Sequence, residues 1–225
     1  MKTNWLIILL TISMCTADAQ SYDKKVLKAG DDLSAMSYYL FPAFTNATVT
    51  LPQGKLVSKM NFNLLTCQLQ FIDGHGDTLN LARPKELTAA VFDSVYFFYG
   101  EDGFYQASNN PAPVQLLVHR KASFNPVKVG AFGVQSHNGG GIDAFESFYS
   151  RTIDRRLLLN EDVEILHTIT YYLQGPGNER VKAGKAAFIK FFPAKKELIE
   201  STIKANKINF NRQADVQLLL KAVSY

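Results

Sequence analysis

Apolar and polar residues alternate along most of residues 46–124. The alternation comes in short runs, and turn-forming residues separate them, as at 52–54 (Pro-Gln-Gly) and 73–77 (Asp-Gly-His-Gly-Asp). A period of two is typical of a strand that packs one face on a core. The runs leave no room for the helical crossovers that parallel strands require. The pattern therefore predicts an antiparallel β-meander that forms a curved sheet or a partial barrel.

The pattern changes after residue 130. Residues 135–150 contain three consecutive glycines together with serine and asparagine, and we predict a long mobile loop there. Residues 163–173 are mostly β-branched or aromatic, which favours a strand, and the Gly-Pro-Gly-Asn sequence at 175–178 favours a hairpin turn. We expect one β-rich domain to span residues 38–192.

Residues 193–225 have a helical period instead. Pro193 suits the first turn of a helix, where its missing N–H costs nothing. The apolar positions of the last helix follow the spacing i, i+3, i+4 and i+7: Val216, Leu219, Leu220 and Val223. We therefore predict a C-terminal two-helix hairpin packed on the same domain, which gives an α+β fold. The alternative for this basic segment is a structural adaptor that docks a partner.

The N-terminus has the three parts of an export signal. Lys2 supplies a positive charge, residues 5–12 form a short apolar core, and residues 17–19 (Ala-Asp-Ala) form a small-x-small cleavage site. We predict a signal peptide at 1–19, followed by a poorly ordered leader at 20–37. No apolar run after the signal reaches the length of a transmembrane helix.

Export implies a location in the periplasm or outside the cell. The alternative is a lipid anchor at Cys15, although the bulky Met14 before it does not suit a lipoprotein signal. Removal of the signal leaves Cys67 as the one cysteine, which excludes an internal disulfide. We expect Cys67 to be a small buried apolar residue, the alternatives being a catalytic thiol or an intermolecular bridge.

Composition and charge narrow the classes of function. Hydrophobic residues make up 47% of the chain and charged residues 20%, which is typical of a globular protein. Residues 180–225 carry ten Lys and Arg against three Asp and Glu, whereas residues 20–179 carry thirteen against sixteen. An anionic lipid or an acidic polysaccharide could meet the basic part. No nucleic-acid recognition motif is present, so we expect no nucleic-acid partner.

The sequence contains no recognisable catalytic or cofactor motif. None of the four histidines has a partner at metal-ligand spacing, so we predict no metal site, no cofactor and no assignable catalytic residue. We expect a non-catalytic binding or structural module of the cell envelope or the medium. The alternative is an extracytoplasmic hydrolase that uses His137 in the loop 135–150 as its acid or base.

Aromatic residues cluster in two neighbouring runs, and these are the first candidates for a partner surface. A second interpretation is that alternate rings fill the core. The candidate partners are an envelope protein, a glycan or an anionic lipid. The candidate residues are Tyr96, Phe97, Phe98, Tyr99, Phe104 and Tyr105.

Several short motifs resemble a family of uncharacterised exported β-rich proteins of Gram-negative bacteria, a family without a known activity. The resemblance rests on residues 39–42 (Tyr-Leu-Phe-Pro), 61–63 (Asn-Phe-Asn), 76–79 (Gly-Asp-Thr-Leu) and the tail 188–225. Ala47 stands where the family usually has glycine. The resemblance implies export and a shared fold, and it supplies no catalytic residues.

Overall fold

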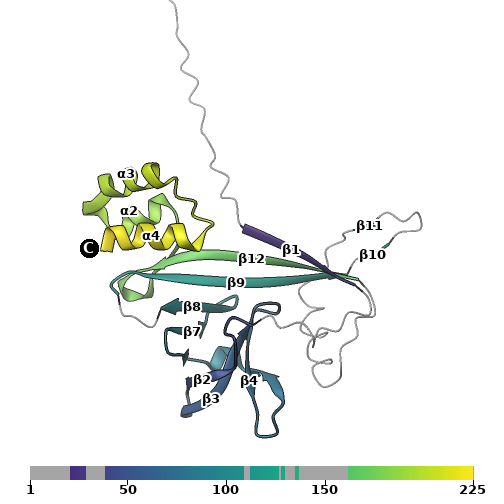
Figure 1. The fold of residues 1–225 in the computed structure, drawn as a ribbon. Helices are drawn as coiled ribbons and strands as arrows, with labels where there is room; N and C mark the ends of the chain where they lie inside the picture. Colours follow the sequence, from purple (N-terminus) through teal and green to yellow (C-terminus); the bar gives the residue numbers. More distant parts are fainter. Residues whose placement is uncertain are drawn as a thin grey trace, which may run out of the picture.

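The structure is a computed structural model that describes residues 21–28, 39–108, 112–126, 128–129, 135–136 and 162–224. In this part of the chain, eleven strands form one antiparallel sheet, two more form a small separate sheet, and three α-helices follow at the C-terminus (Figure 1). The predicted signal 1–19, with Cys15, lies outside the described residues. So does the predicted loop 135–150, apart from its first two residues.

The strands alternate with short turns over most of the chain. Short 3-10 helices span Pro84–Glu86, Pro176–Asn178 and Pro193–Lys195. The helices are α2 (Lys185–Phe191), α3 (Lys196–Asn206) and α4 (Gln213–Ser224). The strands are β1 (Ser21–Leu27), β2 (Thr45–Leu51), β3 (Gly54–Asn63), β4 (Gln68–Ile72), β5 (Thr78–Asn80), β6 (Ala89–Val91), β7 (Val95–Tyr99), β8 (Phe104–Ser108), β9 (Gln115–Pro126), β10 (Lys128–Val129), β11 (Gln135–Ser136), β12 (Val163–Gln174) and β13 (Arg180–Lys182).

The large sheet confirms the predicted antiparallel meander. Its order is β1-β12-β9-β8-β7-β6-β2-β3-β4-β5, with β13 paired to β12, and every pairing is antiparallel. The path does not close on itself, so the fold is a curved open sheet rather than a barrel. Strands β2, β3 and β4 turn away below the long β9–β12 pair (Figure 1).

The segment predicted as a leader contains strand β1. It pairs with β12 along its whole length, from Ser21 opposite Ile169 to Leu27 opposite Val163. Leu27 is buried in a small core with Ile165. The residues of this segment are too polar to predict a strand from their own pattern. The strand forms because it pairs with β12, which lies far away in the sequence.

One core lies between strands β2–β4 and strands β6–β8 of the bent sheet. The ring of Phe62 on β3 stacks on Phe97 of β7 with centroids 5.0 Å apart, and it meets Phe104 of β8 edge-on at 6.2 Å. All three side chains are fully buried. The packing of these rings links β3 to β7 and β8, although neither β7 nor β8 is paired with β3 in the sheet.

A second core lies under the helices. The predicted hairpin is formed by α3 and α4, and α2 adds a helix before Pro193. Ile199 and Leu219 are fully buried in the same cluster as Leu173 of β12. The helices are therefore part of the domain core. In the described part of the chain, no helix is both long enough and apolar enough to cross a membrane.

Two adjacent leucines of α4 test this packing. Leu219 has no exposed surface, whereas 44% of Leu218 is exposed. We expect Leu219→Ala to lower the free energy of unfolding by about 2–5 kcal/mol, because it removes buried contacts and leaves a cavity. The control Leu218→Ala should change it by less than about 0.5 kcal/mol. Urea unfolding measures both values, and equal losses would contradict a core role for α4.

Candidate functional site

The strand register separates the predicted aromatic residues into two groups. Phe97 and Phe104 are buried in the core, and Tyr99 packs edge-on against Phe104 at 5.0 Å. Tyr96 and Phe98 alternate with them along β7 and therefore face the other way. Tyr105 on β8 lies directly opposite Phe98 in the register. Tyr96, Phe98 and Tyr105 belong to a separate cluster on the other face of the sheet, which we call the outer face.

The outer face is the one that the helices leave uncovered. On β9 and β12, Val118 and Leu173 pack under the helices, so their neighbours Leu117, His119 and Tyr172 point to the opposite side. The members of the outer cluster are Tyr96, Phe98, Tyr105, Ala107, Leu117 and Tyr172.

Three rings form a row across three strands. The centroids of Phe98 and Tyr105 are 5.4 Å apart, those of Tyr105 and His119 are 4.6 Å apart, and both pairs are nearly parallel. Tyr172 of β12 meets Tyr105 and His119 edge-on at 5.8 and 6.4 Å. The register that places Phe98 opposite Tyr105, and Tyr105 opposite His119, produces this row directly.

Arg180 supplies a cation above the row. Its guanidinium carbon lies 4.9 Å from the Tyr105 centroid and 5.8 Å from the Phe98 centroid, which is within the range of a cation–π contact. Arg180 opens β13 and pairs with Gln174 at the end of β12. The turn at Pro176–Asn178 thus brings a positive charge back over the aromatic face.

The turn between β7 and β8 contributes a carboxylate. Asp102 accepts a hydrogen bond of 3.0 Å from the Tyr105 hydroxyl, and the same oxygen lies 3.6 Å from Nε2 of His119. The turn runs close against these rings: a Cβ on Gly100 would lie 2.4 Å from Tyr105, and one on Gly103 would lie 3.0 Å from His119. Gly103 also has a φ of +145°, a conformation that other residues rarely adopt.

Burial shifts the titration of the rings. Loss of solvent lowers the pKa of His119, against the smaller opposing effect of Asp102. Burial, followed by the hydrogen bond to Asp102, raises the pKa of Tyr105 to about 12. Near neutral pH the face therefore consists of uncharged rings, with Arg180 as a cation and Asp102 as an anion at its edge.

Three shallow cavities adjoin one another along this face. Their volumes are about 380, 340 and 520 Å³. Asn178 lines all three, and Arg180 lines two of them, so the cavities are neighbours. We call this feature the outer groove. Its main lining residues are Tyr96, Phe98, Asp102, Gln115, Tyr172, Gln174, Asn178 and Arg180.

Amide side chains supply polar groups along the outer groove. The Tyr96 hydroxyl donates to Oε1 of Gln115 at 2.9 Å, and Nε2 of Gln174 donates to Oδ1 of Asn178 at 2.8 Å. Oε1 of Gln174 is buried and has no hydrogen-bond partner within the described residues. The groove thus combines flat apolar rings with fixed hydrogen-bonding groups.

The other candidates from the sequence do not join this site. His75 lies in an exposed turn whose backbone is held by Asp73, and His167 contacts the carbonyl oxygen of Leu65 at 3.1 Å. His137 lies outside the described residues. Among residues that the structure describes, no group of three or more His, Cys, Asp or Glu side chains could hold a metal ion.

Sequence reasoning missed His119, Tyr172 and Arg180 as parts of the site. His119 on β9 is distant in sequence from Tyr172 and Arg180, which belong to the β12–β13 hairpin, and only the pairing of β9, β12 and β13 brings the three together. A weak signal exists in the alternation itself, since His119 and Tyr172 occupy the positions that face away from the helix-packed side.

Comparisons of the chain with protein-family models, with curated proteins and with solved structures find no match. The functional assignment therefore rests on the geometry of the site and on the sequence.

Cys67 is expected to be chemically inert in the folded protein. The thiol is buried, and burial raises its pKa to about 12. In a Cys15→Ser variant, which leaves Cys67 alone, a disulfide reagent should react more than about a hundredfold slower with folded than with urea-unfolded protein, because the thiolate is the reacting species. Fast labelling of the folded protein would instead indicate a reactive thiol.

His119 should make the stability of the protein sensitive to acid. Its folded pKa is lowered, so the unfolded chain takes up a proton at a higher pH than the folded chain does. The free energy of unfolding should therefore be constant above about pH 6.5 with respect to this group and fall as the pH drops below it. Urea unfolding at a series of pH values measures the effect.

The variant His119→Phe keeps a stacked ring but cannot titrate, so its stability should fall less with acid than that of the wild type. His75→Gln, in an exposed turn, is the matched control and should follow the wild type. An unchanged acid dependence in His119→Phe would show that this histidine does not control it.

Proposed function

We propose that the protein is an exported, non-catalytic binding module that holds a saccharide chain of the cell envelope in the outer groove. The observation that carries this proposal is the run of three adjoining cavities along a face of half-buried rings, with amides and one guanidinium at their edges. The signal-like segment 1–19 and the resemblance to exported Gram-negative proteins support the proposal of export.

The chemistry of the groove favours a saccharide over a lipid or a protein surface. A sugar ring has an apolar C–H face that can lie on an aromatic ring, while its hydroxyl groups need donors and acceptors around the edge. Phe98 and Tyr172 provide half-buried rings, and Gln174 and Asn178 provide amides beside them. An acyl chain would offer no hydrogen bond to Oε1 of Gln174, which has no partner within the described residues, whereas a sugar hydroxyl group or amide could donate to it.

The shape of the groove favours an extended ligand. Two of the three cavities are close to the lower limit for a small-molecule site, whereas the three together offer a longer path. Asn178 and Arg180 lie where the cavities meet, so they would contact neighbouring units of one chain.

A binding role also agrees with the position of His119. Only 4% of its surface is exposed, and the ring of Tyr105 stacks on it, so a ligand in the groove would not reach its nitrogen atoms. The alternative function, a hydrolase that uses His137, draws no support from the described residues.

Binding of an oligosaccharide tests the proposal. The test ligand is an N-acetylglucosamine hexamer, whose acetamido groups offer a methyl group to the rings and an amide to Gln174. We expect saturable binding in calorimetry. Phe98→Ala should weaken it about tenfold, equivalent to ~1.4 kcal/mol, because the ring that a sugar would cover is lost.

Arg180→Ala should weaken binding several-fold, and thermal melting checks that the variant stays folded after losing the cation–π contacts with Tyr105 and Phe98. Arg83→Ala is the matched control: Arg83 is also an exposed arginine, and it pairs with Glu86 away from the groove. Equal affinity for the hexamer in the wild type, Phe98→Ala and Arg180→Ala would exclude the outer groove as the binding site.

A further inference from the structure

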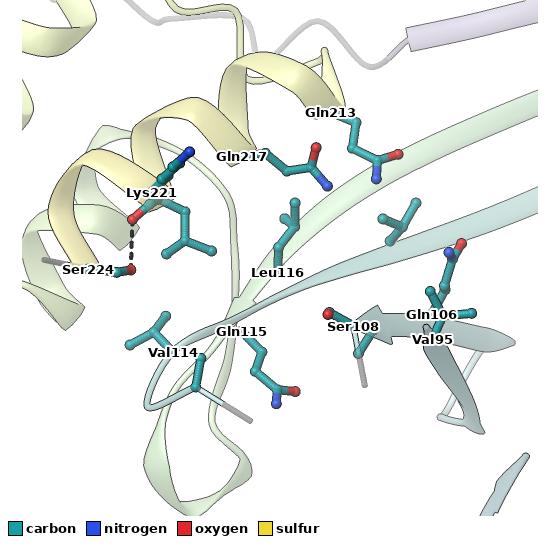
Figure 2. A pocket seen from close by; sticks show the side chains of 14 residues that line it. Val95, Gln106, Ser108, Val114, Gln115, Leu116, Gln213, Gln217, Lys221 and Ser224 are labelled. Carbon is teal, nitrogen blue, oxygen red and sulfur yellow. Dashed lines mark hydrogen bonds between the residues drawn. The ribbon is translucent and has the colours of Figure 1, made fainter. Parts of the chain in front are cut away.

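A further groove lies on the helix side of the sheet, between α4 and strands β8 and β9, and it adjoins the outer groove at Ala112 and Gln115, which line both. Its volume is about 430 Å³, within the range of small-molecule sites. Val114, Leu116 and Val118 form its floor, and Gln213, Gln217 and Lys221 line it from α4. We call it the α4 groove. Figure 2 shows Gln213 and Gln217 extending from the helix toward β9, and Leu116 pointing back toward them.

The sequence of α4 explains why this groove is open at its side. The buried stripe of α4 is Val216, Leu219 and Val223, and it fixes the helix over β9 and β12. Gln213, Gln217 and Lys221 follow at intervals of four and form the next ridge of the same helix. Because these side chains are polar, this flank of α4 does not complete the apolar packing on the sheet.

The lining of the α4 groove is apolar and carries positive charge only. Its exposed surface is mostly apolar, its lining residues include no Asp or Glu, and Lys221 is the one charged residue among them. Within the described residues, Lys221 takes part in no ion pair. An apolar ligand with a negative charge would therefore meet no repulsion here.

Arg120 holds the side-chain amide of Gln106, which lines the groove from β8, opposite α4. Nη1 of Arg120 donates to Oε1 of Gln106 at 2.5 Å. This bond occupies the acceptor of the Gln106 amide, so its N–H₂ group is the end left to donate. Gln106 lines the groove from β8, facing the helix that carries Lys221. The groove thus has a donor at each end: Gln106 on the side of Gln213 and Lys221 on the side of Ser224 (Figure 2).

We propose that the α4 groove binds a fatty-acid-like amphiphile, a molecule with one hydrocarbon chain and one carboxylate. The chain would lie on Val114, Leu116 and Val118, and the carboxylate would lie at the Lys221 end of the groove, where it would meet the ammonium group. The volume suits a medium-length chain and not a whole phospholipid. This site does not depend on the saccharide function proposed for the outer groove.

The test is calorimetric titration of the full chain with decanoate, below the concentration at which it forms micelles, and with decylamine and decanol as comparators. We expect one saturable decanoate site. Decylamine should bind at least tenfold more weakly, because its charge has the wrong sign, and decanol should lie between them. Decylamine binding as tightly as decanoate, or decanoate binding without saturation, would overturn the proposal.

Two variants place the binding in the groove. Gln217→Trp should reduce decanoate affinity at least tenfold by filling the space, and Lys221→Gln should reduce it several-fold. The control Lys204→Gln removes a lysine of α3 that takes no part in the groove and should change nothing. Unchanged decanoate affinity in both groove variants would also overturn the proposal.

Further measurements separate folding and the two sites. Thermal melting checks that Gln217→Trp is folded, and Gln213→Trp replaces it if it is not. Binding of the N-acetylglucosamine hexamer should be the same in Gln217→Trp and in the wild type. Loss of hexamer binding together with decanoate binding in a folded variant would show that the α4 groove is not a separate site.

Discussion

The structure depends on the pairing of β9 with β12. All twelve residues of each strand pair, from Val163 opposite Pro126 to Gln174 opposite Gln115. This ribbon carries β1 and β13 on one side and the rest of the meander on the other. The helices pack on one of its faces and the aromatic row lies on the opposite one. A sheet of this length needs both faces covered or made polar, and the two grooves lie where the covering is incomplete.

The same few residues of β9 build both grooves because side chains alternate along a strand. Leu116 and Val118 face the helices and form the floor of the α4 groove, whereas His119 faces the aromatic side. Gln115, at the start of the strand, lines both grooves. A shift of the β9–β12 register by one residue would exchange these two sets. The buried pairs across the ribbon, such as Tyr171 opposite Val118, oppose that shift.

The parts of the fold that the sequence predicts are those whose signal is local. Alternation and turn residues predict β2 to β9, and the helical spacing of Val216 and Leu219 predicts α4. Strand β1 has no such signal because its pairing partner supplies the reason for its conformation. The candidate site is similar: the sequence indicates Phe98 and Tyr105 as aromatic residues, but Arg180 reaches them only through the β12–β13 hairpin.

The division of charge along the chain gives the two faces different chemistry. The C-terminal part, which forms the helical cap, carries most of the excess of Lys and Arg, and its acidic residues are few and partly paired, as Glu200 is with Lys185. A groove bordered by this cap is therefore positive without any dedicated cation cluster. The outer groove receives Arg180 from the start of the same basic segment but Glu101 and Asp102 from the acidic part, so it carries charges of both signs. For this reason the outer groove suits a largely uncharged ligand, and the α4 groove suits an anion.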